Sequence, residues 1–550
     1  MKTLPFVVGL ILVLVTSATA TESPDSCETA MREFKLSGCL AAPDVLKQTE
    51  AGRWDFNHIL ITGVVDFSML RSTSSHLSFA GSVFDENPLF GRHLPSEQLN
   101  FLGARVRKSP KQISIPAATL VNSIFENDSV WLTGARITET VHIELPHSWT
   151  AHNSGSVKGS VILDDTEIEA PFYISNLVFE SYVGFDRSHF ADLVRLEHVA
   201  FMRDLRADGA AFAGFVTFYD VAFKKEAFLT KTVAKAPIDL FDVHSDQAFL
   251  IEGTFSKQLP TYPVAISVSG SRFQSLEVRG EAQGRIVLSG IDAPLVAVDN
   301  LTAETVELSG STVGNLQVRD LRVSGKVSME WTTVGSLLLD DSGLAQGIDL
   351  RGVGTDRAIL YNTPTSGIRL EGDTASLVNI ESALRKFGQA ETADVVFYQR
   401  KKIENANVPL HTRVVNYIFF DAPSGFGTMP SRTYPFAAGL VIVFGLWFSS
   451  RNALSAKSAS GQPFAAMPFR RRLLAGLSYS SGCFFRSSSG EWECSHYKVY
   501  VPDWKIGRYT IQMRWLPGIP FFQWLTVVEA ILSWLFLALF IATYTHVVLR

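Results

Sequence analysis

The sequence predicts a mainly β protein, in which a four-sided β-solenoid precedes a short helical cap and two transmembrane helices. Three observations lead to this fold class. A large apolar residue recurs every eleven residues in the first half of the chain, the repeat then lengthens to twenty residues, and two apolar runs follow near the C-terminus. A chain of 550 residues is too long for one ordinary core but suits an elongated repeat array with an accessory region.

Residues 1–20 have the features of a secretory signal peptide. A basic start at Lys2 leads into an apolar run from Leu4 to Val15 and then into small residues up to Ala20. We therefore expect cleavage after Ala20; the alternative is an uncleaved anchor helix, for which the run is short. Residues 21–54 are expected to form an N-terminal cap, in which Cys27 and Cys39 are close enough in sequence to form a disulfide in an oxidising compartment.

Residues 55–372 are predicted to form the solenoid. Phe190, Phe201, Phe212 and Phe223 stand eleven residues apart, which first suggests a helix of about three turns per repeat. A helix would also need apolar residues at positions i+3, i+4 and i+7, which are largely missing. A second eleven-residue series interleaves with the first at steps of five and six, and comprises Leu163, Ile174, Phe185, Leu196, Ala207, Phe218 and Leu229. The phenylalanines are therefore predicted to be stacked and buried.

The later, twenty-residue repeat fits the same kind of coil with sides of five residues. Twenty residues are about five and a half helical turns, which would place successive repeats on opposite sides of a helix. A coil with four sides of about five residues accommodates both repeats, and each coil would bury its apolar residues only against neighbouring coils. The recurring pairs are Ser269-Gly270, Ser289-Gly290 and Ser309-Gly310, and related segments with less regular spacing are LSFAGSVF (77–84), LNFLGARV (99–106) and VWLTGARI (130–137).

The small residue before each ladder phenylalanine gives this region a family resemblance. The pairs are Ala200-Phe201, Ala211-Phe212 and Ala222-Phe223, and Ala191-Asp192-Leu193 matches a pentapeptide consensus. The region thus resembles pentapeptide-repeat proteins, which implies a right-handed, four-sided β-helix. The structural alternative is a leucine-rich repeat, part of which LQVRDLRV (316–323) resembles, but no recurring Asn ladder or helical half-repeat accompanies it.

Residues 373–432 are predicted to be a helical cap and a membrane-proximal neck. Two helices are expected, at 373–388 and at 389–404, because apolar residues recur there at helical spacing after capping residues. This order of segments is similar to that of bacterial membrane-anchored pentapeptide-repeat proteins, whose membrane region is described as ion-channel-like. Gly425-Phe426-Gly427 precedes the first apolar run, so it is expected to be a turn at the membrane surface rather than an ion filter.

Transmembrane helices are predicted at 433–450, which is barely long enough, and at 521–550. The intervening segment 451–520 carries ten Lys and Arg residues against three acidic ones, whereas segment 21–432 carries 37 basic and 50 acidic residues. The positive-inside rule therefore places the basic loop in the cytoplasm. The expected location is the inner (plasma) membrane, with the β-helix in the periplasm or the extracellular space.

Two features of the membrane region are candidates for a site. Glu529, near the start of the second span, either lies at the cytoplasmic interface or lies at depth and lines an ion path. The basic cluster Arg470, Arg471 and Arg472 either contacts anionic headgroups or only determines topology. Whether Cys483 and Cys494 form a pair stays open.

Other clusters are expected to be structural. His142, His147 and His152 lie five residues apart and would fall on successive sides of a coil, so no metal site is expected. The adjacent acids Asp164-Asp165 and Asp340-Asp341 would point to opposite faces of a strand. The sequence contains none of the motifs of hydrolases, zinc proteases, P-loop proteins or dinucleotide-binding proteins, so neither catalysis nor a cofactor is expected.

The sequence therefore predicts a membrane-anchored, non-enzymatic protein whose exported β-helix is a scaffold or binding surface for a protein partner. The alternative is an ion-channel-like or transport-accessory protein in which the β-helix is a sensor domain. Nucleic acid is not an expected partner, because a signal peptide would export the acidic body of the chain. Homo-oligomerisation stays open.

Overall fold

The computed structural model describes residues 24–70, 76–91, 94–96, 98–102, 104–107, 112–126, 129–144, 155–257, 263–340, 343–344, 347–361, 370–371, 373–456, 463–485, 492–495, 504–506, 509–511 and 521–548. The predicted signal peptide lies outside these residues. The chain divides into two compact units, Met1–Gly347 and Ile348–Arg550, each considered on its own below. A β-solenoid of about 13 turns makes up most of the described chain.

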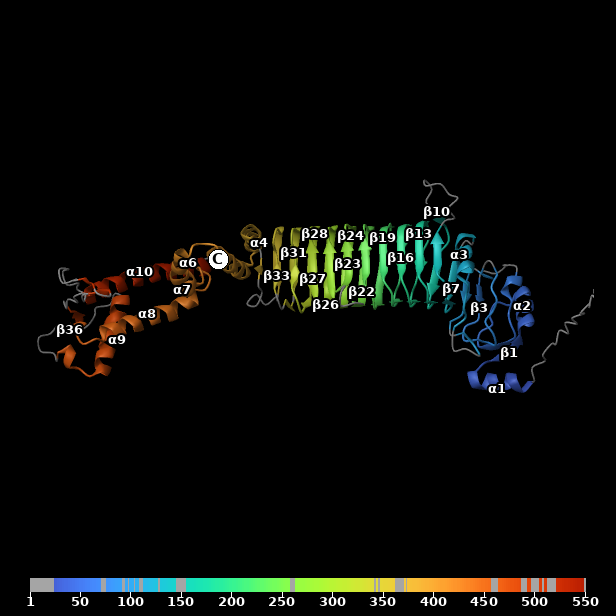
Figure 1. Ribbon diagram of the computed structural model, residues 1–550, viewed down its shortest axis with the longest axis horizontal. Coiled ribbons are helices and arrows are strands. Elements are labelled where there is room, and N and C mark those ends of the chain that lie inside the picture. Colours follow the sequence, from blue (N-terminus) through green and yellow to red (C-terminus); the bar gives the residue numbers. More distant parts are fainter. Residues whose placement is uncertain are drawn as a thin grey trace, which may run out of the picture. The chain divides into compact units, whose positions relative to one another are not determined.

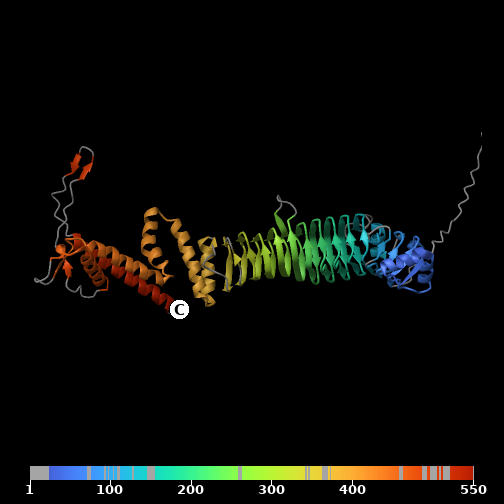
Figure 2. The same ribbon diagram turned by 90° about the horizontal axis from the view of Figure 1, so that it is seen from below.

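Parallel strands of successive coils lie side by side in the first unit (Figure 1), and the view after a quarter-turn shows the same stack (Figure 2). The longest strands of the stack have eight or more residues. These are β13 (Phe172–Phe179), β16 (Val194–Phe201), β19 (Val216–Phe223), β20 (Ala227–Ala234), β22 (His244–Ser256), β24 (Arg272–Gln283), β26 (Asp292–Ala303), β28 (Thr312–Arg319) and β31 (Thr333–Asp340). Some of them turn a corner of the coil, as β13 does at Asn176, where φ is 56°.

Shorter strands make up the rest of the coils. They are β8 (Arg136–Ile137), β9 (Val141–Glu144), β10 (Gly155–Val157), β11 (Val161–Asp164), β12 (Glu167–Ile168), β14 (Val183–Gly184), β15 (His189–Phe190), β17 (Leu205–Arg206), β18 (Ala211–Phe212), β21 (Ile238–Phe241), β23 (Val264–Ser269), β25 (Arg285–Ser289), β27 (Thr305–Ser309), β29 (Arg322–Val323), β30 (Val327–Ser328) and β32 (Gly343–Leu344).

The strand registers give the length of the coils that carry the eleven-residue repeat. Phe172 lies opposite Val194, and Val194 lies opposite Val216. The corner hydrogen bond from the N–H of Asp208 to Asp186 spans the same interval, so these coils contain 22 residues, or two eleven-residue repeats.

The second predicted coil length is confirmed further along the stack. Leu276 lies opposite Val296, and Val296 lies opposite Leu316. The N–H of Ile291 donates to the hydroxyl of Ser311 across the same interval, so these coils contain 20 residues.

One coil between the two regions is longer than either repeat. Ile238 lies opposite Ile266, and the N–H of Val243 donates to the hydroxyl of Ser271, which gives a step of 28 residues. The repeat pattern did not predict this insertion.

The phenylalanines of the eleven-residue series are buried, as predicted, but they form two columns. The rings of Phe179, Phe201 and Phe223 stack in one column, with centroids 5.3 Å and 5.2 Å apart. Phe190 stacks on Phe212 in the other, at 5.1 Å. A residue therefore stacks on its equivalent one full coil along, while its neighbour at eleven positions lies half a coil away.

The N-terminal end of this unit contains the helices α1 (Pro24–Phe34), α2 (Ala42–Glu50) and α3 (Ala117–Glu126). A four-stranded parallel sheet runs through β1 (Gly38–Ala41), β2 (Ile59–Thr62), β4 (Val83–Phe84) and β6 (Arg105–Val106). The three early repeats also align, because β3 (His76–Ser78), β5 (Gln98–Asn100) and β7 (Val130–Thr133) place Leu77, Leu99 and Leu132 opposite one another.

One corner of the solenoid explains the recurring Ser-Gly pairs. Gly270, Gly290 and Gly310 have φ angles of 59°, 60° and 59°, a left-handed conformation that glycine adopts without steric cost. The next coil places Trp331 at this corner with φ 57°, since Gly310 N–H donates to the carbonyl of Glu330. A bulky residue at positive φ is a true outlier, and the side chain of Trp331 is 72 % exposed.

The second unit begins with β33 (Ile348–Asp349), β34 (Gly354–Tyr361) and β35 (Leu370–Glu371) and is otherwise mainly helical. The two predicted cap helices are confirmed as α4 (Thr374–Lys386) and α5 (Ala390–Ala406). The side chain of Asp373 caps α4 by accepting from the N–H of Ser376 at 2.8 Å. Further helices are α6 (Leu410–Asn416), α7 (Ala422–Ser424), α8 (Thr433–Phe448), α9 (Phe469–Phe485) and α10 (Phe521–Val548), and the strand pairs are β36 (Leu454–Ala456) with β37 (Trp492–Cys494) and β38 (Trp504–Ile506) with β39 (Tyr509–Ile511).

Among the described residues, one helix is long and apolar enough to cross a membrane. This stretch, Phe521–Ala542 of α10, has 22 residues and a mean hydropathy of 2.3. The other apolar helix, α8, has 16 residues and so extends over about 24 Å, less than a hydrocarbon core of about 30 Å. Of the two predicted spans, the structure therefore supports one, in α10; the segment predicted at 433–450 contains an apolar helix that is shorter than a span.

We expect Trp331→Gly to leave the thermal midpoint unchanged or to raise the stability by up to about 1 kcal/mol. The substitution relieves a left-handed conformation that costs an L-residue ~1–2 kcal/mol, partly offset by the greater freedom of glycine in the unfolded chain. The reciprocal substitution Gly310→Trp should lower stability, since φ is positive there too. Thermal unfolding of the detergent-solubilised chain measures both, and a large loss of stability in Trp331→Gly would contradict this account.

Candidate functional site

Helices α8, α9 and α10 of the second unit pack together around residues that the sequence analysis had not connected. Aromatic pairs show that α8 and α10 run antiparallel: Tyr434 lies 5.2 Å from Phe540, Phe436 lies 5.0 Å from Phe536, and Trp447 lies 6.5 Å from Phe521. The third helix, α9, lies within the segment predicted as a basic loop. Its arginines and serines lower its hydropathy, which is why an apolar-run search passes over it.

Two glycines bring α8 and α9 into close contact. A Cβ atom added to Gly476 would collide with the backbone oxygen of Gly445, and one added to Gly445 would stand 2.6 Å from Cδ2 of Leu477. Small residues of this kind allow helix backbones to approach closely where the surroundings are apolar. Phe448 and Tyr479 extend the contact with an edge-to-face pair at 5.0 Å.

Glu529 lies inside this helical bundle. The residue is 1 % exposed, and its Oε1 atom accepts a hydrogen bond from the hydroxyl of Ser480 on α9. The other carboxylate oxygen, Oε2, is buried and has no hydrogen-bond partner among the described residues. The hydroxyl of Ser533, one turn further along α10, donates to the backbone oxygen of Glu529 at 2.7 Å.

This environment distinguishes Glu529 from an ordinary surface carboxylate. Burying a carboxylate with one unpaired oxygen is costly, and proteins keep such groups where they bind or transfer a proton or cation. Sequence reasoning left both an interfacial and a deep position open. Ser480, which donates to the carboxylate of Glu529, belongs to α9, the helix that the sequence did not predict.

The arginine cluster occupies the start of α9. Arg470 and Arg471 are exposed, whereas Arg472 is partly buried, with its guanidinium 6.0 Å from the ring centroid of Phe469. Cations at the N-terminal end of a helix face the positive end of its dipole, so this placement does not stabilise α9 by itself. The cluster is accessible to an anionic surface.

The cysteines fall into two groups. Cys27 of α1 and Cys39 of β1 form a disulfide with Cα atoms 6.4 Å apart, which links the first helix to the first strand. Cys494 of β37 is a free thiol whose pKa is raised by burial, an effect that hydrogen bonds with Thr526 and Tyr479 oppose. The side chain of Cys483 is not described.

Several other sequence candidates have structural roles. The imidazole of His142 stacks on Tyr173 at 4.6 Å, while His147 and His152 lie outside the described residues. The described part of the chain contains no group of three or more His, Cys, Asp or Glu side chains that could hold a metal ion. Gly425, Phe426 and Gly427 all have positive φ and form a turn after α7.

The column of corners that contains Trp331 extends along the stack to two exposed aromatic rings in earlier coils. Tyr219 and Phe241 are 39 % and 47 % exposed and stack at 5.3 Å with an interplanar angle of 6°. Strand pairing places Phe241, Ser269, Ser289 and Ser309 in one outward column, followed by Glu330 at the next coil. At about 4.8 Å per coil, Phe241 and Trp331 lie roughly 19 Å apart along the stack.

We call this surface the corner strip. It consists of Tyr219 and Phe241 at one end, the three Ser-Gly pairs in the middle, and Trp331 at the other end. The middle of the strip carries only serine side chains and glycines. The aromatic side chains at both ends therefore project further from the backbone than the residues between them. At the end that contains Tyr219 and Phe241, the imidazole of His198 contacts Asp220, with Nδ1 and Oδ2 2.7 Å apart, so polar groups border the rings.

Comparison with known protein families, curated proteins and solved structures gives no match for this chain. A function for this chain is therefore inferred from its own residues.

The adjacent acids at the corner after β11 have different partners. Asp165 forms a two-pronged ion pair with Arg187, at 2.8 Å and 2.7 Å. Asp164 instead accepts from the N–H of Asp186 at 3.1 Å, and Asp186 accepts in turn from the N–H of Asp208 at 2.8 Å. The acids thus form a ladder across three coils, and burial together with the charge of Asp186 raises the pKa of Asp164 from 3.8 to about 6.

We expect Asp164→Asn to stabilise the fold at pH 7.5 and to have no effect at pH 4. A carboxyl with a raised pKa in the folded state favours folding while it is protonated, and this contribution is lost as pH rises from about 4 through 6. The amide keeps the acceptor oxygen for Asp186. The gain should be below about 1 kcal/mol because the side chain is partly exposed.

Thermal midpoints at the two pH values measure this effect. The matched control is Asp165→Asn, which removes one partner of an ion pair and should lower the midpoint at pH 7.5. Equal midpoints for Asp164→Asn and the parent chain at pH 7.5 would contradict the predicted repulsion.

Proposed function

We propose that this chain is a membrane-anchored, non-enzymatic protein whose exported β-solenoid is a binding surface for a protein partner. The observation that carries the proposal is the corner strip, in which exposed aromatic rings stand at both ends of a side-chain-poor track. Aromatic side chains are enriched in the centres of protein interfaces, and parallel strand pairing holds these rings in fixed positions. A track of roughly 19 Å suits an extended segment of about six residues.

The finer points of the fold belong to the same proposal. We propose coils of four sides, as in the right-handed β-helices of pentapeptide-repeat proteins, because sides of five and six residues account for both coil lengths. We also propose that α8 and α10 both enter the bilayer, with the charged segment between them in the cytoplasm and the solenoid in the periplasm or outside the cell. The apolar composition of α8 and the antiparallel ring pairs with α10 support this arrangement.

We expect the double substitution Tyr219→Ser and Phe241→Ser to reduce capture of the partner at least tenfold, and Trp331→Ser to weaken it to a lesser degree. Truncating exposed aromatic anchors removes contact area without disturbing the buried core. The measurement is affinity capture from detergent-solubilised membranes with a tag on the solenoid, followed by quantitative mass spectrometry of the retained proteins.

The matched control is Met202→Ser, which removes an exposed apolar side chain outside the corner strip. Capture that is equal for all three variants and the parent chain would show that the corner strip is not the binding surface. Catalytic turnover of any compound by the solenoid would contradict the proposal that the chain is not an enzyme.

Glu529 favours a second candidate function, in which the helical bundle is an ion-conducting or transport-accessory unit. We expect Glu529→Gln to abolish a proton-dependent current in reconstituted vesicles while the protein still folds, since the amide keeps an oxygen that can accept from Ser480. The control is Glu493→Gln, an exposed carboxylate of β37. A current that persists in Glu529→Gln, or no current in the parent chain, would leave the binding function alone.

A further inference from the structure

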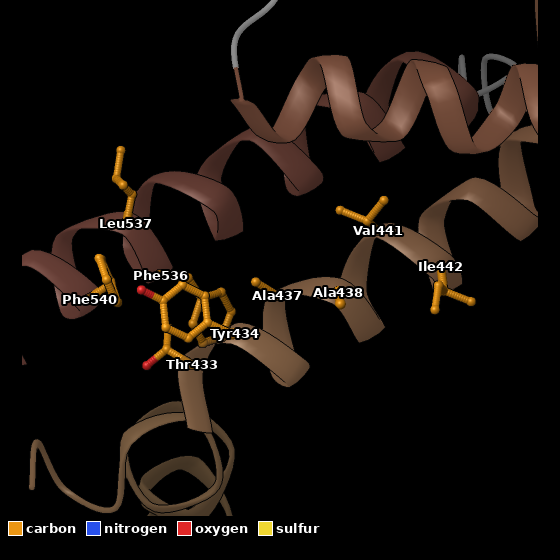
Figure 3. A pocket seen from close by; sticks show the side chains of 9 residues that line it. All are labelled: Thr433, Tyr434, Ala437, Ala438, Val441, Ile442, Phe536, Leu537 and Phe540. Atoms are coloured by element: carbon orange, nitrogen blue, oxygen red, sulfur yellow. The ribbon is translucent and has the colours of Figure 1, made fainter. Parts of the chain in front are cut away.

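A groove of about 490 Å³ runs between α8 and α10 (Figure 3). Its wall is apolar apart from two hydroxyl groups, those of Thr433 and Tyr434 at the start of α8. The groove follows α8 for about 13 Å, from Thr433 to Ile442. Its lining residues are Thr433, Tyr434, Ala437, Ala438, Val441 and Ile442 of α8 and Phe536, Leu537 and Phe540 of α10.

The shape of the groove follows from the residues that face it. Two alanines on α8, Ala437 and Ala438, leave space beside the larger rings of Phe536 and Phe540, and Figure 3 shows these side chains on facing stretches of the two helices. One wall belongs to the helix that is long enough to cross a membrane. A narrow apolar slot that runs along a membrane helix matches a hydrocarbon chain lying parallel to that helix.

Two cations without carboxylate partners lie beside the end of the groove. Arg432 directly precedes Thr433, and its guanidinium is 5.8 Å from the ring centroid of Tyr398. The ammonium of Lys402 is 4.7 Å from the same ring, so both charges lie around one aromatic side chain. Both residues are exposed, and neither forms an ion pair within the described residues.

Three neighbouring cations, in contrast, have carboxylate partners. Arg385 pairs with Glu381 and Asp394, Arg400 pairs with Glu381 and Glu404, and Lys401 pairs with Glu404. The hydroxyl of Tyr398 itself donates to the buried carboxylate of Asp421 at 3.0 Å. Arg432 and Lys402 are therefore available to an anion from outside the chain.

We propose that this groove and the two cations form a binding site for an anionic phospholipid. One acyl chain would occupy the groove, and the phosphate would lie between Arg432 and Lys402, where charge-assisted hydrogen bonds favour it. The inference rests on the membrane placement proposed above. A lipid held here would contact both apolar helices and the neck through one molecule.

The test uses the full chain in detergent micelles, titrated with phosphatidylglycerol or with phosphatidylcholine of the same acyl chains, and counts bound lipids by native mass spectrometry. We expect phosphatidylglycerol to bind about tenfold more tightly than phosphatidylcholine, because two cations contribute to the attraction. The double substitution Arg432→Gln and Lys402→Gln should reduce the affinity for phosphatidylglycerol to that for phosphatidylcholine. Ala438→Trp should reduce the binding of both lipids.

Two controls match these variants. Lys386→Gln with Arg413→Gln removes the same charge from exposed residues outside the groove, and Ile531→Trp adds the same ring to an exposed position of α10 that does not line it. Neither should change lipid binding. Inorganic phosphate should not compete at millimolar concentration, because it lacks the acyl chain.

Three outcomes would overturn the proposal. The first is equal binding of the two lipids, and the second is unchanged binding in either test variant. The third is a dimer that Ala438→Trp dissociates, which would make a second copy of the chain the occupant. Flotation of the parent chain with vesicles separates the premises: a chain that does not float refutes the membrane placement itself, whereas one that floats but binds lipid equally in all variants refutes only the site.

Discussion

Hydrogen bonding between successive coils is the constraint on which the rest of the structure depends. The N–H of Phe172 donates to Leu193, that of Val194 to Phe215, and that of Val216 to Pro237, each time one coil further along. In the described coils the backbone groups bond mainly to neighbouring coils, so equivalent inward residues of successive coils lie opposite one another. The stacked columns of phenylalanine, the left-handed corners and the exposed corner strip all follow from this repetition.

The repetition also explains what the sequence could predict. An inward residue such as Phe201 must recur at the coil length, so the spacing of the large apolar residues reports that length directly, in the earlier coils and in the shorter later ones. The eleven-residue spacing wrongly suggests that Phe201 stacks on Phe212, because these two residues belong to different columns. The longer step from Ile238 to Ile266 has no periodic signal, because the extra residues leave the paired positions on either side unchanged.

The helical part of the second unit has no such repeat and was harder to predict. Long apolar runs identify α10, and helical spacing identifies α4 and α5. Neither pattern identifies helix α9, because its arginines and serines give it neither a high hydropathy nor a clear apolar face. Its contact with α8 depends on Gly445 and Gly476, residues whose importance lies in the absence of a side chain. The surroundings of Glu529 therefore became visible only with the structure.

The disulfide between Cys27 and Cys39 has a consequence for assembly. A stack of parallel strands can in principle grow without limit, because its end strand offers unpaired backbone groups to another molecule. Here the first strand of the N-terminal sheet, β1, has only four residues and lies between α1 and α2, and the disulfide holds α1 against it. Buried contacts among Leu36, Leu60 and Val83 fix the same end. The covalent link thus acts as a terminator that opposes filament growth from this end of the solenoid.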